Sequence, residues 1–273
     1  GIGAPGLSPG THMAYVSIAE DELETGNISR EGRLAAILQG RYHGVAVSLK
    51  RYSLEPHPLL QAREISLQRE IAALAAIWSP SVVHFFGVCE RPGSLCLVTE
   101  WCWGEDLFSQ IHNGVSELSH SQRLKVCSNT VAAGMYLHGL EPPIMHRNLN
   151  SKNLLLAAPV SLQEDPISVK VSGLGSARIK NTDPSAAWPL MTINVGEAYW
   201  SAPETQTMRY SEKIDVYSYG MVMYETFSSR IPMEELPAER VQEAVRLGRR
   251  PELDVLLDSD LEKLMIACWS QRP

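Results

Sequence analysis

The 273-residue sequence has no run of about 18 or more apolar residues, so no transmembrane helix is expected. It also lacks a block of lysine and arginine, and its formal net charge is -7. We therefore expect neither nucleic-acid binding nor membrane contact by this domain. The five cysteines include no C-x-x-C pair, which argues against a disulfide framework or a zinc site. Buried free thiols, no bound metal and a cytoplasmic location are the expectation.

Three stretches of different composition follow one another along the chain. Residues 1–13 are rich in Gly, Pro and Ser and are expected to be a tag or disordered tail. Residues 14–103 are β-rich, and residues 104–273 are helix-rich. The β-rich stretch should hold four strands, at 37–41, 45–50, 82–88 and 94–100, and an amphipathic helix at 65–77. The helix-rich stretch should hold helices at 107–111, 121–138, 211–228, 236–248 and 260–269 and a short strand at 169–171.

Four short motifs occur in one order along these elements. They are Val45-Ala46-Val47, the run from His146 to Asn153, Gly173-Leu174-Gly175, and Ala202-Pro203-Glu204 followed by Asp215. The ordered set resembles the protein kinases from about residue 25 onward. The resemblance implies an α+β, bilobal protein-kinase fold. A small β-rich N-lobe with one helix would span 14–103, and a larger α-helical C-lobe would span 104–273 and be cut short at its C-terminal end.

Other short sequence segments are similar to one branch of these kinases. Gly40 to Gly44, Ser79 to Cys89 and Leu264 to Trp269 resemble the tyrosine-kinase-like branch. Gly248 to Pro251 is similar to the receptor-interacting kinases and the mixed lineage kinase domain-like protein. Integrin-linked kinase and the Ras-suppressor kinases share some of these segments, so the sequence does not decide the subfamily.

The positions that carry catalysis in this family hold other residues here. Ser48 stands at the strand-three lysine, Asn148 at the base, Asn150 at the catalytic-loop lysine and Gly173 at the magnesium aspartate. Serine cannot neutralise phosphate charge, and asparagine is a poor proton acceptor where a general base contributes about 10²–10⁴-fold. Without the carboxylate, Mg²⁺ loses a preferred ligand. The sequence therefore predicts a catalytically inactive pseudokinase with no catalytic residues.

The sequence leaves the roles of the glycine-rich loop and of Lys50 open. The loop pattern falls on Arg30, Gly32 and Ala35, so only the middle glycine remains and a plain turn is expected. Lys50 follows Ser48 by two residues and points to the same face, roughly 6–7 Å along the strand. It either pairs with Glu70 in place of the missing lysine or is a solvated residue near the strand end.

The resemblance also implies a nucleotide pocket and a structural framework. These residues require no cofactor. They are compatible with binding of ATP without magnesium. The candidate nucleotide-binding residues are Gly32, Lys50, Glu70, Thr99 at the gatekeeper position, Glu100, Cys102 and Asn153. The candidate structural and regulatory residues are Leu74, His146, Arg147, Leu174, Glu204 and Asp215, of which Leu74, His146, Leu174 and Asp215 would stack between the lobes.

The segment 176–201 corresponds to the activation loop of the family. Candidate phosphorylation sites in it are Thr182, Ser185 and Thr192, with Arg147 and Arg178 as docking cations. The alternative is a solvated loop without a regulatory role.

Three functions compete on this evidence. The first is a pseudokinase switch or scaffold that binds signalling proteins, phosphorylated by an upstream receptor-interacting-type kinase and linked by resemblance to necroptosis. The second is a weak ATP-dependent protein kinase that uses Lys50. The third is a passive protein-binding scaffold that binds no nucleotide.

Overall fold

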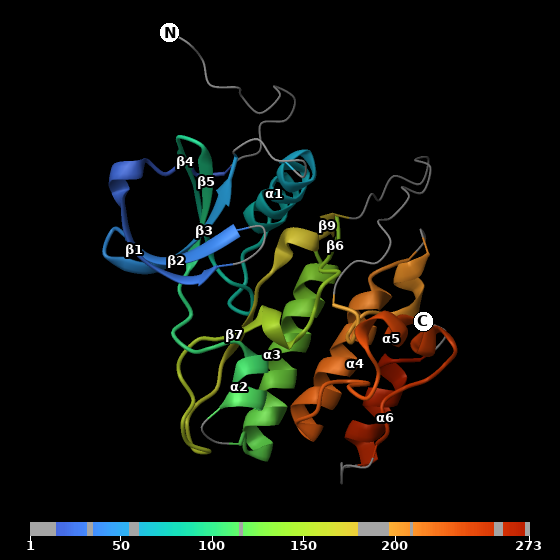
Figure 1. Cartoon of the computed structure of the whole chain (residues 1–273). Coiled ribbons are helices and arrows are strands. Elements are labelled where there is room, and N and C mark those ends of the chain that lie inside the picture. The colour runs from blue at the N-terminus through green and yellow to red at the C-terminus, as the bar shows by residue number, and fades with distance from the viewer. Residues whose placement is uncertain are drawn as a thin grey trace.

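The computed structural model describes residues 15–31, 35–54, 60–114, 117–179, 197–207, 210–253 and 259–270. The expected tail at 1–13 and the loop position Gly32 lie outside these residues. Figure 1 shows two parts, a sheet with one helix above and a group of helices below. This division agrees with the β-rich and helix-rich stretches of the sequence.

The upper part is a five-stranded antiparallel sheet in the order β1-β2-β3-β5-β4, with helix α1 beside it. The elements are η1 (Glu20–Glu22), β1 (Leu23–Glu31), β2 (Ala35–Tyr42), β3 (Val45–Ser53), α1 (Leu60–Ala75), β4 (Phe85–Arg91) and β5 (Ser94–Glu100). His43 and Gly44 both have positive φ, as a two-residue hairpin turn between β2 and β3 requires. Strand β1 was not predicted, because only its first residue, Leu23, is buried and its sequence lacks apolar alternation.

The lower part contains the five predicted helices and several very short strands. Its elements are α2 (Leu107–Asn113), α3 (His120–His138), β6 (Ile144–Met145), η2 (Ser151–Asn153), β7 (Leu154–Leu156), β8 (Val169–Val171), η3 (Leu174–Ser176), β9 (Arg178–Ile179), η4 (Pro203–Gln206), α4 (Lys213–Ser228), α5 (Ala238–Arg246) and α6 (Ser259–Cys268). Helix α4 is buried on nearly all sides, which explains its long apolar sequence. Strands β6, β7 and β9 have two or three residues each, too few for a period-two pattern.

Two hydrophobic clusters stabilise the molecule. The larger one is continuous through both parts and includes Leu74 of α1, Leu174 of η3 and Met221 of α4. The smaller one covers the other face of the sheet and includes Leu38 and Val98. Because the larger cluster crosses the boundary, the sheet and the helices hold the region between them in a defined geometry.

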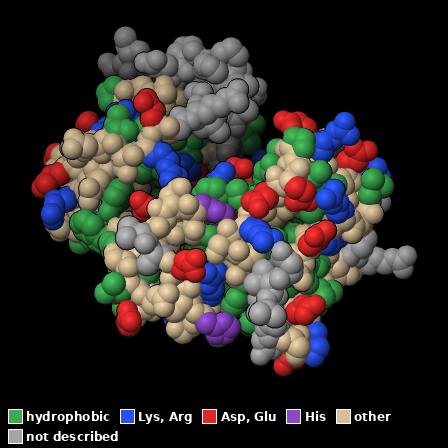
Figure 2. Space-filling model, turned by 60° about the horizontal axis from the view of Figure 1, so that its bottom comes forward, with side chains coloured by type: hydrophobic (Ala, Val, Ile, Leu, Met, Phe, Trp, Pro, Cys, Tyr) green, Lys and Arg blue, Asp and Glu red, His purple; other side chains and the backbone are tan. Residues whose placement is uncertain are grey.

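The surface gives little indication of a partner. Figure 2 shows basic and acidic side chains interspersed over the face turned toward the viewer. None of the helices in the described ranges is both long and apolar enough to cross a lipid bilayer.

Candidate active site

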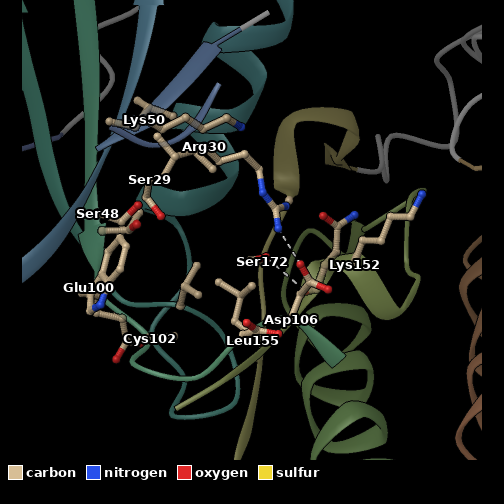
Figure 3. Close-up of a pocket in the computed structure, with 18 of the residues that line it drawn as sticks. Ser29, Arg30, Ser48, Lys50, Glu100, Cys102, Asp106, Lys152, Leu155 and Ser172 are labelled. Atoms are coloured by element: carbon tan, nitrogen blue, oxygen red, sulfur yellow. Dashed lines mark hydrogen bonds and ion pairs between the residues drawn. The ribbon is translucent and has the colours of Figure 1, made fainter. Parts of the chain in front are cut away.

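A cavity of about 530 Å³ lies between the sheet and the helical part. Strands β1, β3 and β5, helix α1, the segment after β5 and the loops around η2 and η3 contribute side chains to it. Figure 3 shows residues from both parts pointing into this space. All the predicted nucleotide-binding residues within the described ranges line it, namely Lys50, Glu70, Thr99, Glu100, Cys102 and Asn153.

Lys50 pairs with Glu70 at the wall of this cavity. Its Nζ lies 2.8 Å from Glu70 Oε1 and 2.9 Å from Oε2. The hydroxyl of Tyr52 donates to Glu70 Oε2 at 2.5 Å, and burial together with this carboxylate raises the pKa of Tyr52. Of the two alternatives for Lys50, the structure has the paired one. The pair fixes α1 against β3 and leaves a cation at the edge of the cavity. This cation lies two residues along β3 from Ser48, on the same face of the strand.

The end of β5 and the residues that follow it form one wall of the cavity. Glu100 Oε1 accepts from the backbone N–H of His84 at 2.7 Å and from Lys170 Nζ at 2.6 Å. Its side chain is therefore held by β8 and the start of β4. Burial, with the charge of Glu100, raises the pKa of the Cys102 thiol to about 12, so that thiol stays protonated at neutral pH. The apolar walls and the backbone of Cys102 suit a flat, uncharged ring such as adenine.

Asp215 anchors the segment that corresponds to the catalytic loop. Its Oδ2 and Oδ1 accept from the backbone N–H groups of His146 and Arg147, each at 2.8 Å. His138 Nε2 lies 2.8 Å from Asp215 Oδ2. Burial alone would raise the pKa of Asp215, but these histidine and backbone contacts outweigh it and lower that pKa. They also hold Arg147 at a φ of 67°, a left-handed conformation that a side chain disfavours.

His146 is buried and fully hydrogen-bonded as a neutral imidazole. Its Nε2 donates to the carbonyl of Ser172 at 2.8 Å, and its Nδ1 accepts from the backbone N–H of Asn148 at 3.2 Å. Burial lowers the pKa of His146. The predicted stack of Leu74, His146, Leu174 and Asp215 consists of four buried residues at the boundary of the two parts, and its regulatory role stays a prediction.

Amide groups occupy the place where a magnesium site would lie. Asn148 Oδ1 accepts from Asn150 Nδ2 at 2.9 Å, and Asn153 Nδ2 donates to the carbonyl of Asn148 at 2.8 Å. Gly173 has a φ of 77° and contributes no side chain. No group of three His, Cys, Asp or Glu residues that could hold a metal occurs within the described ranges. The donor set therefore does not fit a magnesium ion held by the protein, since Mg²⁺ prefers carboxylates.

A cluster of arginines lies beside the start of the activation segment. Arg147 is buried, and its Nε and Nη1 have no hydrogen-bond partner among the described residues. Burial lowers the pKa of Arg147, and the positive charges of Arg178 and Arg69 contribute to this. Such a site favours an anion, as predicted for a phosphorylated loop. The candidate sites themselves, Thr182, Ser185 and Thr192, lie outside the described residues.

Glu204 of the Ala-Pro-Glu motif lies at the start of η4. Burial raises the pKa of Glu204, and the positive charge of Arg250 opposes this effect. Arg250 is thus the cation that faces Glu204 in this part of the chain. The guanidinium of Arg250 also lies 5.2 Å from the ring of Tyr217.

A buried carboxylate that the sequence analysis missed joins three segments. Glu225 of α4 has no exposed surface. Its Oε1 lies 2.8 Å from Ser151 Oγ and 3.0 Å from His112 Nε2, and its Oε2 accepts from Trp200 Nε1 at 2.8 Å. A glutamate inside an apolar helix was the available signal, since such a residue is rarely buried without partners.

Two further residues at the cavity escaped the sequence analysis. Arg30 Nη2 forms an ion pair with Asp106 Oδ2 at 2.7 Å across the cavity mouth. Arg30 had been considered only as a lost glycine. Asp106 was detectable as the residue before the apolar start of α2, a position that favours a capping aspartate.

A sequence family described as "Protein tyrosine and serine/threonine kinase" matches residues 24–273. The chain belongs to the protein kinase family. The dual specificity protein kinase splA of Dictyostelium discoideum is 32% identical over 266 residues, which cover 93% of this chain and 11% of splA. Human mitogen-activated protein kinase kinase kinase 7 is 29% identical over 273 residues, which cover 97% of this chain and 41% of that protein. The kinase chain thus spans less than half the length of either relative.

These relationships confirm the expected α+β kinase fold and correct the expected function. Both relatives are of the tyrosine-kinase-like type, whereas the finer resemblance to the receptor-interacting group stays a prediction. The prediction of a catalytically inactive switch or scaffold is wrong, because the relatives are named as protein kinases. That prediction gave too much weight to Ser48. The structure has the lysine–glutamate pair two residues further along β3, and phosphoryl transfer depends mostly on positioning and charge.

Proposed function

We propose that this domain is an ATP-dependent protein kinase of low turnover that uses Lys50 as its active-site lysine. The observation that carries the proposal is the contact of Lys50 Nζ with both oxygens of Glu70 at the cavity wall. In kinases this type of pair must be in place for phosphoryl transfer. The relatives named as kinases support the same conclusion.

The cavity offers the contacts that ATP needs at both of its ends. Apolar side chains of Val83, Leu97 and Leu155 line it together with Cys102, where a base would fit. Lys50 and Arg30 supply positive charge on the side toward η3. Asn148 can orient a hydroxyl but cannot take its proton. The turnover should therefore lie below that of a kinase with an aspartate base by about 10²–10⁴-fold.

Transfer of labelled phosphate from ATP to the domain itself and to a generic substrate protein tests the proposal. Lys50→Met should reduce the rate at least about tenfold, since it removes a charge near the transferred group. The matched control is Lys125→Met, a change at an exposed position of α3 far from the cavity, and its rate should equal that of the wild type. Incorporation by the wild type that persists in folded Lys50→Met protein would contradict the proposed role.

We also propose a setting for this activity. Signalling proteins are the proposed substrates and partners, with a receptor-interacting-type kinase acting upstream on the activation loop. The Nε and Nη1 atoms of Arg147, which have no hydrogen-bond partner among the described residues, support phosphorylation of that loop. All five cysteines are free thiols, which supports a reducing compartment such as the cytoplasm.

A further inference from the structure

The mouth of the cavity is spanned by an ion pair between its two walls. Arg30 belongs to β1 of the sheet, and Asp106 immediately precedes α2 of the helical part. Their Nη2 and Oδ2 atoms are 2.7 Å apart, although the residues are separated by 76 positions in the chain. Figure 3 shows Arg30 extending from the sheet to Asp106.

The two partners differ in how firmly they are held. The Asp106 side chain is 4% exposed, and its Oδ1 accepts from the backbone N–H of Ser109 at 2.9 Å, which caps α2. The Arg30 side chain is 60% exposed. Water can therefore solvate the guanidinium of Arg30 when it leaves Asp106, whereas the Asp106 carboxylate keeps the Ser109 donor and stays in place.

The other two described cations that line the cavity pair with residues other than Asp106. Lys50 is held by both oxygens of Glu70. The ammonium group of Lys152 lies 3.6 Å from Glu197, on the side away from Arg30. Of the three described cations that line the cavity, Arg30 alone reaches across its opening.

A polyphosphate inside the cavity would need more positive charge than the side chains that line it provide. Four acidic side chains line the cavity, so they outnumber the three cations. Gly173 and the amide of Asn153 supply no metal site that could bring compensating charge. A guanidinium group is suited to this task because it binds phosphate oxygens in a bidentate manner.

We propose that Arg30 is a phosphate-binding residue of this domain and that it exchanges Asp106 for the phosphates of the nucleotide. Arg30 then bonds either Asp106 or the phosphates, and it determines the preference for a nucleoside triphosphate over a nucleoside. The inference rests on the proposed function, because it requires that ATP binds in this cavity.

The affinities of ATP and adenosine, measured by titration calorimetry at one fixed magnesium concentration, test this proposal. Arg30→Gln should weaken the binding of ATP on the order of tenfold, equivalent to about 1.4 kcal/mol, and leave the affinity for adenosine unchanged. Asp106→Asn keeps an oxygen for the cap but removes the competing charge. This variant should bind ATP about two- to fivefold more tightly, relative to adenosine, than the wild type does. Arg30→Lys should keep part of the preference for ATP.

The matched control is Arg41→Gln, because Arg41 is an exposed arginine of the same sheet that donates to the carbonyl of Gly44. Its affinities for both ligands should equal those of the wild type. An equal change for ATP and adenosine in Arg30→Gln, or no change in either, would overturn the role of Arg30 alone. Failure of the wild type to bind either ligand would overturn both this inference and the proposed ATP site. The expected ratios without phosphate transfer would leave the role of Arg30 intact and overturn only the kinase activity.

Discussion

The side-chain amide of Asn153 fills the space beside Gly173. An ideal Cβ added to Gly173 would lie 2.8 Å from Asn153 Nδ2 and closer still to Oδ1. The amide is fixed there because its Nδ2 donates to the carbonyl of Asn148 at 2.8 Å. Glycine at 173 is thus required by packing as well as by its φ of 77°. The missing aspartate and the position of Asn153 are two aspects of one local arrangement.

Substitution of Gly173 should therefore lower the stability of the domain. Gly173→Ala and Gly173→Asp both place a Cβ against Asn153 in a left-handed conformation, which should cost about 1–2 kcal/mol. The measurement is the thermal unfolding midpoint, where this cost amounts to a few degrees. Gly134→Ala is the matched control, since nothing lies within 4 Å of its added Cβ in α3. The control should gain about 0.5–1 kcal/mol. Equal stability of the Gly173 variants and the wild type would show that Asn153 moves aside freely.

Restoring a base at position 148 should raise the turnover. Asn148→Asp keeps the size of the side chain, and its oxygen can still accept from Asn150 Nδ2 and from the backbone N–H of Glu197. The new carboxylate can take the proton of the substrate hydroxyl, so kcat should increase by about 10²-fold or more. The initial rate of labelled phosphate transfer at saturating ATP measures it. Asn113→Asp, at an exposed position of α2, is the control and should have the wild-type rate. An unchanged kcat in Asn148→Asp would mean that proton removal does not limit this kinase.

The stability of the domain should fall as the pH decreases from 7 toward 5, in part because of His146. The unfolded chain protonates this imidazole at about pH 6.5. Burial lowers the pKa of His146 in the folded state, so protons bind preferentially to the unfolded chain in this range. Protonation of Nδ1 would also remove the acceptor for the backbone N–H of Asn148.

Unfolding midpoints measured between pH 7 and pH 5 check this expectation. The variant His146→Gln cannot titrate, so its midpoint should decrease less over the same range, whatever its stability at pH 7. If wild type and variant lose stability in parallel, the acid sensitivity comes from other groups.

The sequence was sufficient for the elements with strong periodicity and for the fold, but not for contacts across the cavity. Helix α4 and strands β2, β3 and β5 follow from their apolar patterns, whereas the polar edge strand β1 has none. The position of Lys50 on the same face as Ser48 could be deduced from the two-residue period of a strand. The pairing of Arg30 with Asp106 could not, because no local pattern relates residues 76 positions apart. The error about activity arose because the combined changes at Ser48, Asn148 and Gly173 were weighted above the pairing of Lys50 with Glu70, which the sequence left as one of two alternatives.

Glu225 determines which parts of the kinase move together. Its single carboxylate joins Ser151 of the catalytic loop, Trp200 near the end of the activation segment and His112 of α2. Removal of one partner leaves a buried charge with too few donors, a cost that the remaining partners share. These segments therefore belong to one cooperative unit that opens only as a whole. A disturbance at His112 of α2 would thus be transmitted to Ser151 and Trp200 through one carboxylate.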